Sequence, residues 1–152
     1  MSASAKICGL KTPETIAAAV GGGAAYIGFN FYPRSPRSVT PEDAARLAAK
    51  VPPSVSTVAL VVDADDALID RIAEALAPDI VQLHGKETPE RVREIKARTG
   101  RTVMKALSIA TSQDIARARV YEAVADILMF DAKTPPGGLP GGDRKSTRLN
   151  SS

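Results

Sequence analysis

Residues 80–92, IVQLHGKETPERV, hold the repeating unit that decides the fold. The apolar run Ile80–Leu83 is typical of a strand that is buried on both faces. Thr88-Pro89-Glu90 then supplies a capping hydroxyl, a proline in the first turn and an acid near the positive end of the helix dipole. The same Thr-Pro-Glu signal begins at Thr12 and at Thr40. The stretch therefore predicts one strand followed by one helix.

Five more short runs resemble this strand. They are Ala5–Cys8, Tyr26–Phe31, Thr57–Val62, Thr102–Ala106 and Ile127–Phe130. Alanine-rich helical patterns separate them, and Asp63 and Ser112 are the expected caps of the two helices that lack Thr-Pro-Glu. An open doubly wound sheet and a (β/α)8 TIM barrel both fit such a repeat. Since a complete barrel needs roughly 200 residues or more, we expect an incomplete α/β TIM barrel with about six of its eight βα units.

The domain organisation follows from the change in composition near residue 142. Residues 1–142 are expected to form one partial TIM-barrel domain that ends in the glycine- and proline-rich loop 134–142. Residues 143–152, DRKSTRLNSS, are polar and lack an apolar period. They cannot bury a face, so we expect a disordered tail that is not native to the protein.

Composition narrows the functional class. Apolar residues make up 44% of the chain, and no run among them is long enough to span a bilayer. The single cysteine cannot form an internal disulfide, which fits a soluble, cytoplasmic protein. The net charge is only +3 and aromatic residues are 4%, so neither nucleic acid nor membrane is an expected partner.

Three side chains at predicted strand ends are candidates for chemistry. Cys8 ends the first strand and Asp131 ends the sixth, and the carboxyl ends of parallel strands form the active site of such folds. Arg37 lies in the loop YPRSPRS after the second strand, where a guanidinium can bind a carboxylate with two hydrogen bonds. On the residues alone, an inert buried thiol, a solvated acid and a solvated arginine remain alternatives.

Gln82 and His84 share strand parity, so their side chains point to the same face of the sheet. His84 is the only histidine, and no further ligands cluster near it in the sequence. We therefore expect no metal site and assign Gln82 and His84 a supporting role beside the site.

Four motifs occur in an order and spacing that resemble one family. They are KICGL (6–10), GFNFYPRSPRSV (28–39), VQLHGKE (81–87) and LMFDAK (128–133). Together they resemble phosphoribosylanthranilate isomerase, a TIM-barrel enzyme of tryptophan biosynthesis. The resemblance implies an Amadori rearrangement of N-(5-phosphoribosyl)anthranilate without any cofactor. It also implies that Cys8 is the general base, Asp131 the general acid and Arg37 the anchor of the anthranilate carboxylate.

One departure from the family pattern leads to an alternative. Asp143 breaks the family's continuation after the glycine loop, and the last barrel loops usually bind the substrate phosphate. The 152-residue chain is therefore expected to be inactive, and its unpaired edge strands can make it a non-catalytic, self-associating fragment. A second alternative is another phosphosugar barrel enzyme, such as indole-glycerol-phosphate synthase, for which Lys105 is a candidate catalytic lysine.

Overall fold

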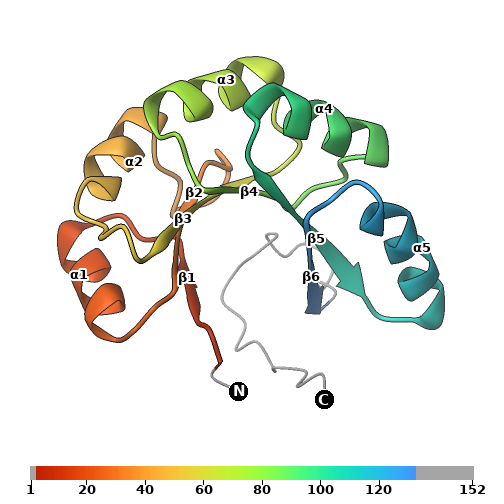
Figure 1. The fold of residues 1–152 in the computed structure, drawn as a ribbon, viewed down its shortest axis with the longest axis horizontal. Helices are drawn as coiled ribbons and strands as arrows, with labels where there is room; N and C mark the ends of the chain where they lie inside the picture. Colours follow the sequence, from red (N-terminus) through yellow and green to blue (C-terminus); the bar gives the residue numbers. More distant parts are fainter. Residues whose placement is uncertain (1–2, 133–152) are drawn as a thin grey trace.

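Six parallel strands form one curved sheet with five helices on its convex side (Figure 1) within residues 3–132, the part of the chain that the computed structural model describes. The strands are β1 (Lys6–Cys8), β2 (Tyr26–Asn30), β3 (Ser56–Val61), β4 (Ile80–Leu83), β5 (Thr102–Ile109) and β6 (Ile127–Ala132). The helices are α1 (Pro13–Gly21), α2 (Pro41–Ala48), α3 (Asp66–Ala75), α4 (Pro89–Thr99) and α5 (Ser112–Glu122).

The strand order separates the two predicted architectures. Each strand pairs with its neighbours in sequence, in the order β1-β2-β3-β4-β5-β6, and every pair is parallel. A doubly wound sheet would reverse its order at a switch point, whereas a barrel advances in one direction. The prediction of an incomplete TIM barrel is confirmed, and the doubly wound sheet is excluded for the described residues.

The Thr-Pro-Glu signals begin helices as predicted. The hydroxyls of Thr12, Thr40 and Thr88 each accept a hydrogen bond from the backbone N–H three residues later. Each threonine has extended backbone geometry and is followed by a proline in the first turn. Local sequence therefore determines where these three helices start.

The two remaining caps were predicted wrongly. Asp65 caps α3 in place of Asp63, because the Asp63 carboxylate accepts a hydrogen bond from the backbone N–H of Lys86 at 2.7 Å. Thr111 caps α5 in place of Ser112, because Thr111 forms a reciprocal capping box with Asp114. In the first case a contact between two loops overrides the local signal.

Strands β5 and β6 extend beyond their predicted ends. They run in register through the pairs Ser108↔Asp131 and Ile109↔Ala132. The polar Ser108 and Asp131 interrupt the apolar pattern, which is why the sequence does not indicate these last positions. The extension places Asp131 inside the end of a strand, where backbone pairing holds it.

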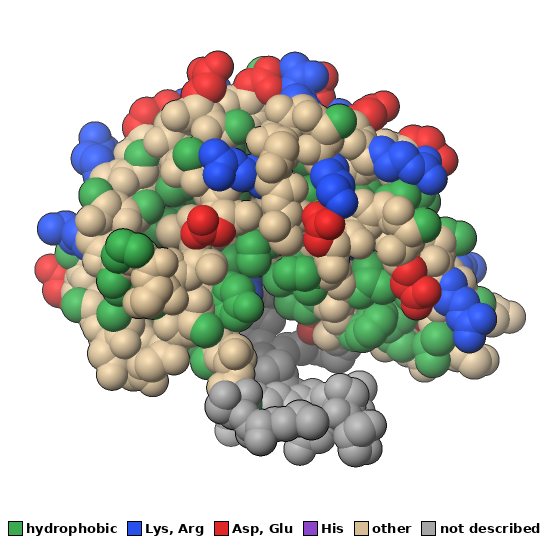
Figure 2. Space-filling view, viewed as in Figure 1, with side chains coloured by type: hydrophobic (Ala, Val, Ile, Leu, Met, Phe, Trp, Pro, Cys, Tyr) green, Lys and Arg blue, Asp and Glu red, His purple; other side chains and the backbone are tan. Residues whose placement is uncertain are grey.

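The two faces of the sheet bury different clusters. The larger cluster lies between the strands and the helices and includes Ile27, Phe29 and Val103. A smaller cluster of Val58, Ile80 and Met104 lies on the concave face. Figure 2 shows acidic and basic side chains along the outer rim, while hydrophobic side chains gather on the inner side of the arc.

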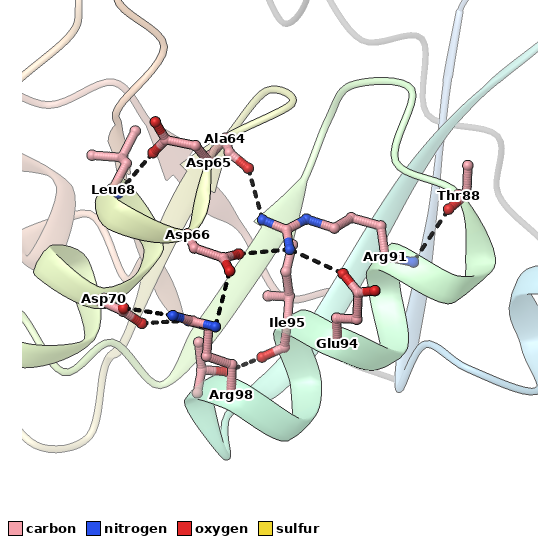
Figure 3. A network of polar contacts seen from close by, with 11 residues as sticks. Ala64, Asp65, Asp66, Leu68, Asp70, Thr88, Arg91, Glu94, Ile95 and Arg98 are labelled. Carbon is pink, nitrogen blue, oxygen red and sulfur yellow. Dashed lines mark hydrogen bonds and ion pairs between the residues drawn. The ribbon is translucent and has the colours of Figure 1, made fainter.

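Ion pairs connect neighbouring helices on the outer surface (Figure 3). Asp66 of α3 contacts both Arg91 and Arg98 of α4, at 2.7 and 3.0 Å. Arg98 also donates two hydrogen bonds to Asp70, and Arg91 donates one to the carbonyl oxygen of Ala64. These contacts fix how α3 and α4 lie against each other, although salt screens exposed pairs of this kind.

Two further observations concern membrane-spanning helices and the range of residues that the structure describes. Between residues 3 and 132, no helix has the length and apolar character needed to cross a membrane. The predicted loop 134–142 and the predicted tail 143–152 lie outside the described residues.

Candidate active site

The first part of the site is the thiol at the end of β1. Cys8 is half-buried and lies in register with Gly28 of β2. A methyl group at Gly28 would lie 2.9 Å from the Cys8 Sγ, which is closer than real carbon–sulfur contacts. The absent side chain of Gly28 therefore leaves the space that the thiol needs.

Arg37 lies against the same strand end. Its Nη1 donates to the carbonyl oxygen of Cys8 at 3.4 Å. A methyl group at Gly9 would lie 2.7 Å from the Arg37 Cδ, and Gly9 has a positive φ of 78°. Glycine is thus required here both by the backbone conformation and by the arginine that passes over it. Lys11 adds a second contact with the loop, donating to the carbonyl oxygen of Pro36 at 3.0 Å.

The loop that carries Arg37 is shaped by two polar side chains, the buried Asn30 and the half-buried Ser35. Asn30 is 2% exposed, and its Oδ1 accepts from the backbone N–H of Tyr32 at 2.8 Å. The Ser35 hydroxyl accepts from the backbone N–H of Arg37 at 3.2 Å. Arg37 therefore comes from a structured turn that directs its guanidinium to the end of β1.

The second part of the site joins β4 and β6. The His84 Nε2 lies 3.6 Å from the Asp131 Oδ2, and the His84 Nδ1 lies 3.0 Å from the Gln82 Nε2. His84 and Asp131 line a pocket of about 200 Å³, together with Gly85, Ser108 and Tyr121. The Asp131 side chain is 38% exposed, so a ligand can reach its carboxyl group.

Burial keeps the imidazole neutral. Desolvation lowers the pKa of His84 from its usual 6.5, and the positive charges of Lys105 and Lys6 lower it further. The negative charge of Asp131 acts in the opposite direction and is the larger of the two charge effects that raise it. His84 is consequently uncharged at neutral pH and can donate from one nitrogen while it accepts at the other.

Lys105 does not lie where the alternative function requires it. Its side chain is 2% exposed and its Nζ lies 2.9 Å from the Glu87 Oε2. The ammonium also stands 5.7 Å from the ring centre of Tyr121 in α5, on the side of the sheet that the helices cover. Lys105 also lines the pocket that holds His84 and Asp131, but its ammonium is held in the buried pair with Glu87. The structure therefore gives no support to Lys105 as the catalytic lysine of an indole-glycerol-phosphate synthase.

The Glu87–Lys105 pair supports the loop after β4, and the sequence analysis missed it. Glu87 accepts hydrogen bonds from the backbone N–H groups of Asp63 and Gly85. Lys105 donates to the carbonyl oxygen of Gly85 at 2.8 Å. The charged residue inside the apolar run of β5 was the available signal, but its partner is 18 residues away and no local pattern joins them.

Asp126 marks the opposite end of β6. It pairs with Lys96 at 2.6 Å and accepts from the backbone N–H of Val103 at 2.9 Å. The hydrogen bond from Lys96, followed by that from Val103, lowers the pKa of its carboxyl group. Asp126 lies at the amino end of the strand, away from the carboxyl edge where Asp131 lies, so it is a poorer candidate acid than Asp131.

The structure thus gathers the five candidate residues at the carboxyl ends of the strands in two groups. Cys8 and Arg37 form one group, and Gln82, His84 and Asp131 form the other. Within residues 3–132, no cluster of three or more histidine, cysteine or acidic side chains is arranged to hold a metal ion.

The strands of this parallel sheet follow one another in sequence order, and polar side chains lie at its carboxyl edge. This arrangement is that of a TIM-barrel protein. Residues 5–143 match the family described as N-(5'phosphoribosyl)anthranilate (PRA) isomerase. The chain therefore belongs to the phosphoribosylanthranilate isomerase family, as the four motifs predict.

Individual relatives agree with this assignment. The chain is 58% identical over 146 residues to the N-(5'-phosphoribosyl)anthranilate isomerase of Parvibaculum lavamentivorans, covering 94% of this chain and 68% of that protein. The crystal structure of the Thermotoga maritima isomerase superposes with a TM-score of 0.81 at 36% identity, covering 89% of this chain and 64% of that one.

A second solved isomerase carries a ligand. It is a phosphoribosyl anthranilate isomerase in complex with reduced 1-(o-carboxyphenylamino)-1-deoxyribulose 5-phosphate. It superposes with a TM-score of 0.79 at 34% identity, covering 87% of this chain and 66% of that one. The chain therefore spans about two thirds of the length of these relatives.

Proposed function

We propose that this chain carries the acid, the base and the carboxylate anchor of an isomerase that acts on N-(5'-phosphoribosyl)anthranilate. The product would be 1-(o-carboxyphenylamino)-1-deoxyribulose 5-phosphate, the compound whose reduced form the solved relative binds. The observation that carries the proposal is the site itself. A thiol beside an arginine and a carboxyl beside a neutral histidine lie at the carboxyl edge of one sheet.

Asp131 is the proposed general acid. It would protonate the ring oxygen of the ribose while the anthranilate nitrogen donates its lone pair to C1′, so that the ring opens to an iminium. A carboxyl group that releases its proton becomes an anion, and the adjacent His84 supports this charge. Its place on a paired strand holds it in a constant direction.

Cys8 is the proposed general base. Its thiolate would remove the proton from C2′, giving an enolamine. Protonation of C1′ and loss of the proton from the C2′ hydroxyl then give the ketone. The iminium nitrogen accepts the electron pair, so the reaction needs no cofactor. Arg37 lies against Cys8 and would bind the anthranilate carboxylate, which orients the substrate toward the thiol.

The test measures loss of substrate fluorescence. Because the relatives are longer, the 152-residue chain is compared with the same chain extended by the last third of the Parvibaculum protein. We expect turnover from the extended chain alone, and a loss of about 100-fold or more in its Cys8→Ala and Asp131→Asn variants. Asp126→Asn, which changes an acid at the other end of the same strand, is the matched control and should retain turnover. Near-normal turnover of either site variant would refute its assigned role.

Three further proposals concern the domain, its association and its location. Residues 1–142 form one domain and residues 143–152 lie outside it, which the family match ending at residue 143 supports. A base that must stay reduced suits the cytoplasm.

Second copies of this chain associate through β1 and β6, where Ile7 is 40% and Phe130 57% exposed. Sedimentation velocity tests this: Phe130→Ser should shift the chain toward monomer, and an unchanged distribution would contradict it.

A further inference from the structure

We infer that Gln82 is a positioning residue that holds His84 in the tautomer protonated at Nε2, so that the imidazole presents an N–H to Asp131. The inference rests on the proposed function in one respect, because it assigns Asp131 the role of general acid. The arrangement of the three side chains stands without that role.

The first step is the contact between Gln82 and His84. Gln82 is 1% exposed, and its Nε2 lies 3.0 Å from the His84 Nδ1. An amide nitrogen only donates, so Nδ1 must be the acceptor in this contact. A neutral imidazole with an unprotonated Nδ1 carries its proton on Nε2.

The second step is independent of the amide and comes from the other side of the ring. The Asp131 Oδ2 lies 3.6 Å from the His84 Nε2. An ionised carboxylate only accepts, so it favours an N–H at Nε2 and is repelled by a lone pair there. Rotating the Gln82 amide by half a turn would place its oxygen against Nδ1, and the ring would then turn a lone pair toward Asp131. When Asp131 is ionised, both neighbours of the ring therefore select the same tautomer.

The third step is the other end of the amide. The Gln82 Oε1 is buried and has no hydrogen-bond partner among the described residues. A buried acceptor without a partner destabilises the fold, and an apolar side chain of similar size would avoid that cost. The contact that this amide does make is the one with His84, which supports a role in holding the imidazole.

This tautomer of His84 determines which oxygen of the Asp131 carboxyl group carries the proton. When the Nε2 N–H faces Oδ2, the proton of the neutral carboxyl group lies on Oδ1. Transfer of that proton to a substrate oxygen leaves a carboxylate, and the Nε2 N–H already faces the new negative charge. The proton passes from Oδ1 to the substrate and His84 keeps its own. The 3.6 Å separation is longer than a hydrogen bond, and we expect it to shorten when substrate binds.

The experiment reads the tautomer directly from the 152-residue chain. His84 is the only histidine, so labelled imidazole nitrogens give one unambiguous pair of NMR signals. At about pH 8, where the ring is neutral, we expect Nε2 protonated and Nδ1 unprotonated. Gln82→Glu places an acceptor against Nδ1 and should protonate it. Gln113→Glu makes the same change at an exposed position of α5 and should leave both signals unchanged.

Two results would overturn the inference. One is a wild-type ring protonated at Nδ1, which needs no variant to detect. The other is a folded Gln82→Glu variant, checked by circular dichroism, whose tautomer equals that of the wild type.

Turnover of the extended chain separates the two proposals. We expect Gln82→Glu to lower its kcat about 10-fold or more while KM changes little. An unchanged kcat would overturn the positioning role. An extended wild-type chain without turnover would refute the proposed function, whereas the imidazole signals decide the tautomer by themselves.

Discussion

Lys105→Met removes one charge from the buried pair beneath the candidate site and should be strongly destabilising. The Lys105 Nζ lies 2.9 Å from the Glu87 Oε2, and both side chains are 2% exposed. At this separation and an effective dielectric constant of about 20, the attraction is about 6 kcal/mol. Burying the two charges offsets most of it in the wild type, but the variant leaves Glu87 buried without a counter-charge. We therefore expect a loss of about 3–5 kcal/mol in the free energy of unfolding.

Urea unfolding followed by circular dichroism measures this loss. Glu87→Gln in the Lys105→Met background removes the unpaired charge, so the double variant should be more stable than Lys105→Met alone. Arg71→Met is the control, because it breaks an exposed pair with Glu42 and should leave the midpoint nearly unchanged. A loss below about 1 kcal/mol, or a double variant no more stable than the single one, would refute the reasoning.

Three other perturbations have defined outcomes. Gly28→Ala places a methyl group 2.9 Å from the Cys8 Sγ, so it should lower the free energy of unfolding by about 1–3 kcal/mol. It should also change the rate at which the Cys8 thiol reacts with a disulfide reagent, and an unaltered rate would contradict the packing argument. Burial lowers the pKa of His84 below its usual 6.5, so the stability that the neutral imidazole contributes is complete above that pH and is lost as pH falls toward the folded-state pKa. His84→Asn should therefore make the urea midpoint depend less on pH between about pH 7 and 5, and an unchanged pH dependence would argue against this reasoning. Arg98→Met breaks the ion pair with Asp66, so it should lower the urea midpoint at low salt but not in about 1 M NaCl. Equal losses at both salt concentrations would exclude an electrostatic origin of the stabilisation by Arg98.

Local patterns predicted the elements that local physics controls. Thr12, Thr40 and Thr88 begin helices because a hydroxyl and a proline act within one turn of the chain. Patterns failed where a distant contact competed. Asp63 is the clearest case, because its carboxylate binds the backbone of Lys86 and not the helix that follows it. The ends of β5 and β6 were underestimated because Ser108 and Asp131 are polar yet paired.

Sequence by itself determined the βα repeat, the family and the types of the candidate site residues, because capping, strand periodicity and short motifs are all local. The tertiary structure decided which of those residues meet. Register places Cys8 against Gly28, the curvature of the sheet brings His84 to Asp131, and parity sends Lys105 to Glu87. These contacts join residues between 18 and 47 positions apart, and only the folded backbone fixes such distances.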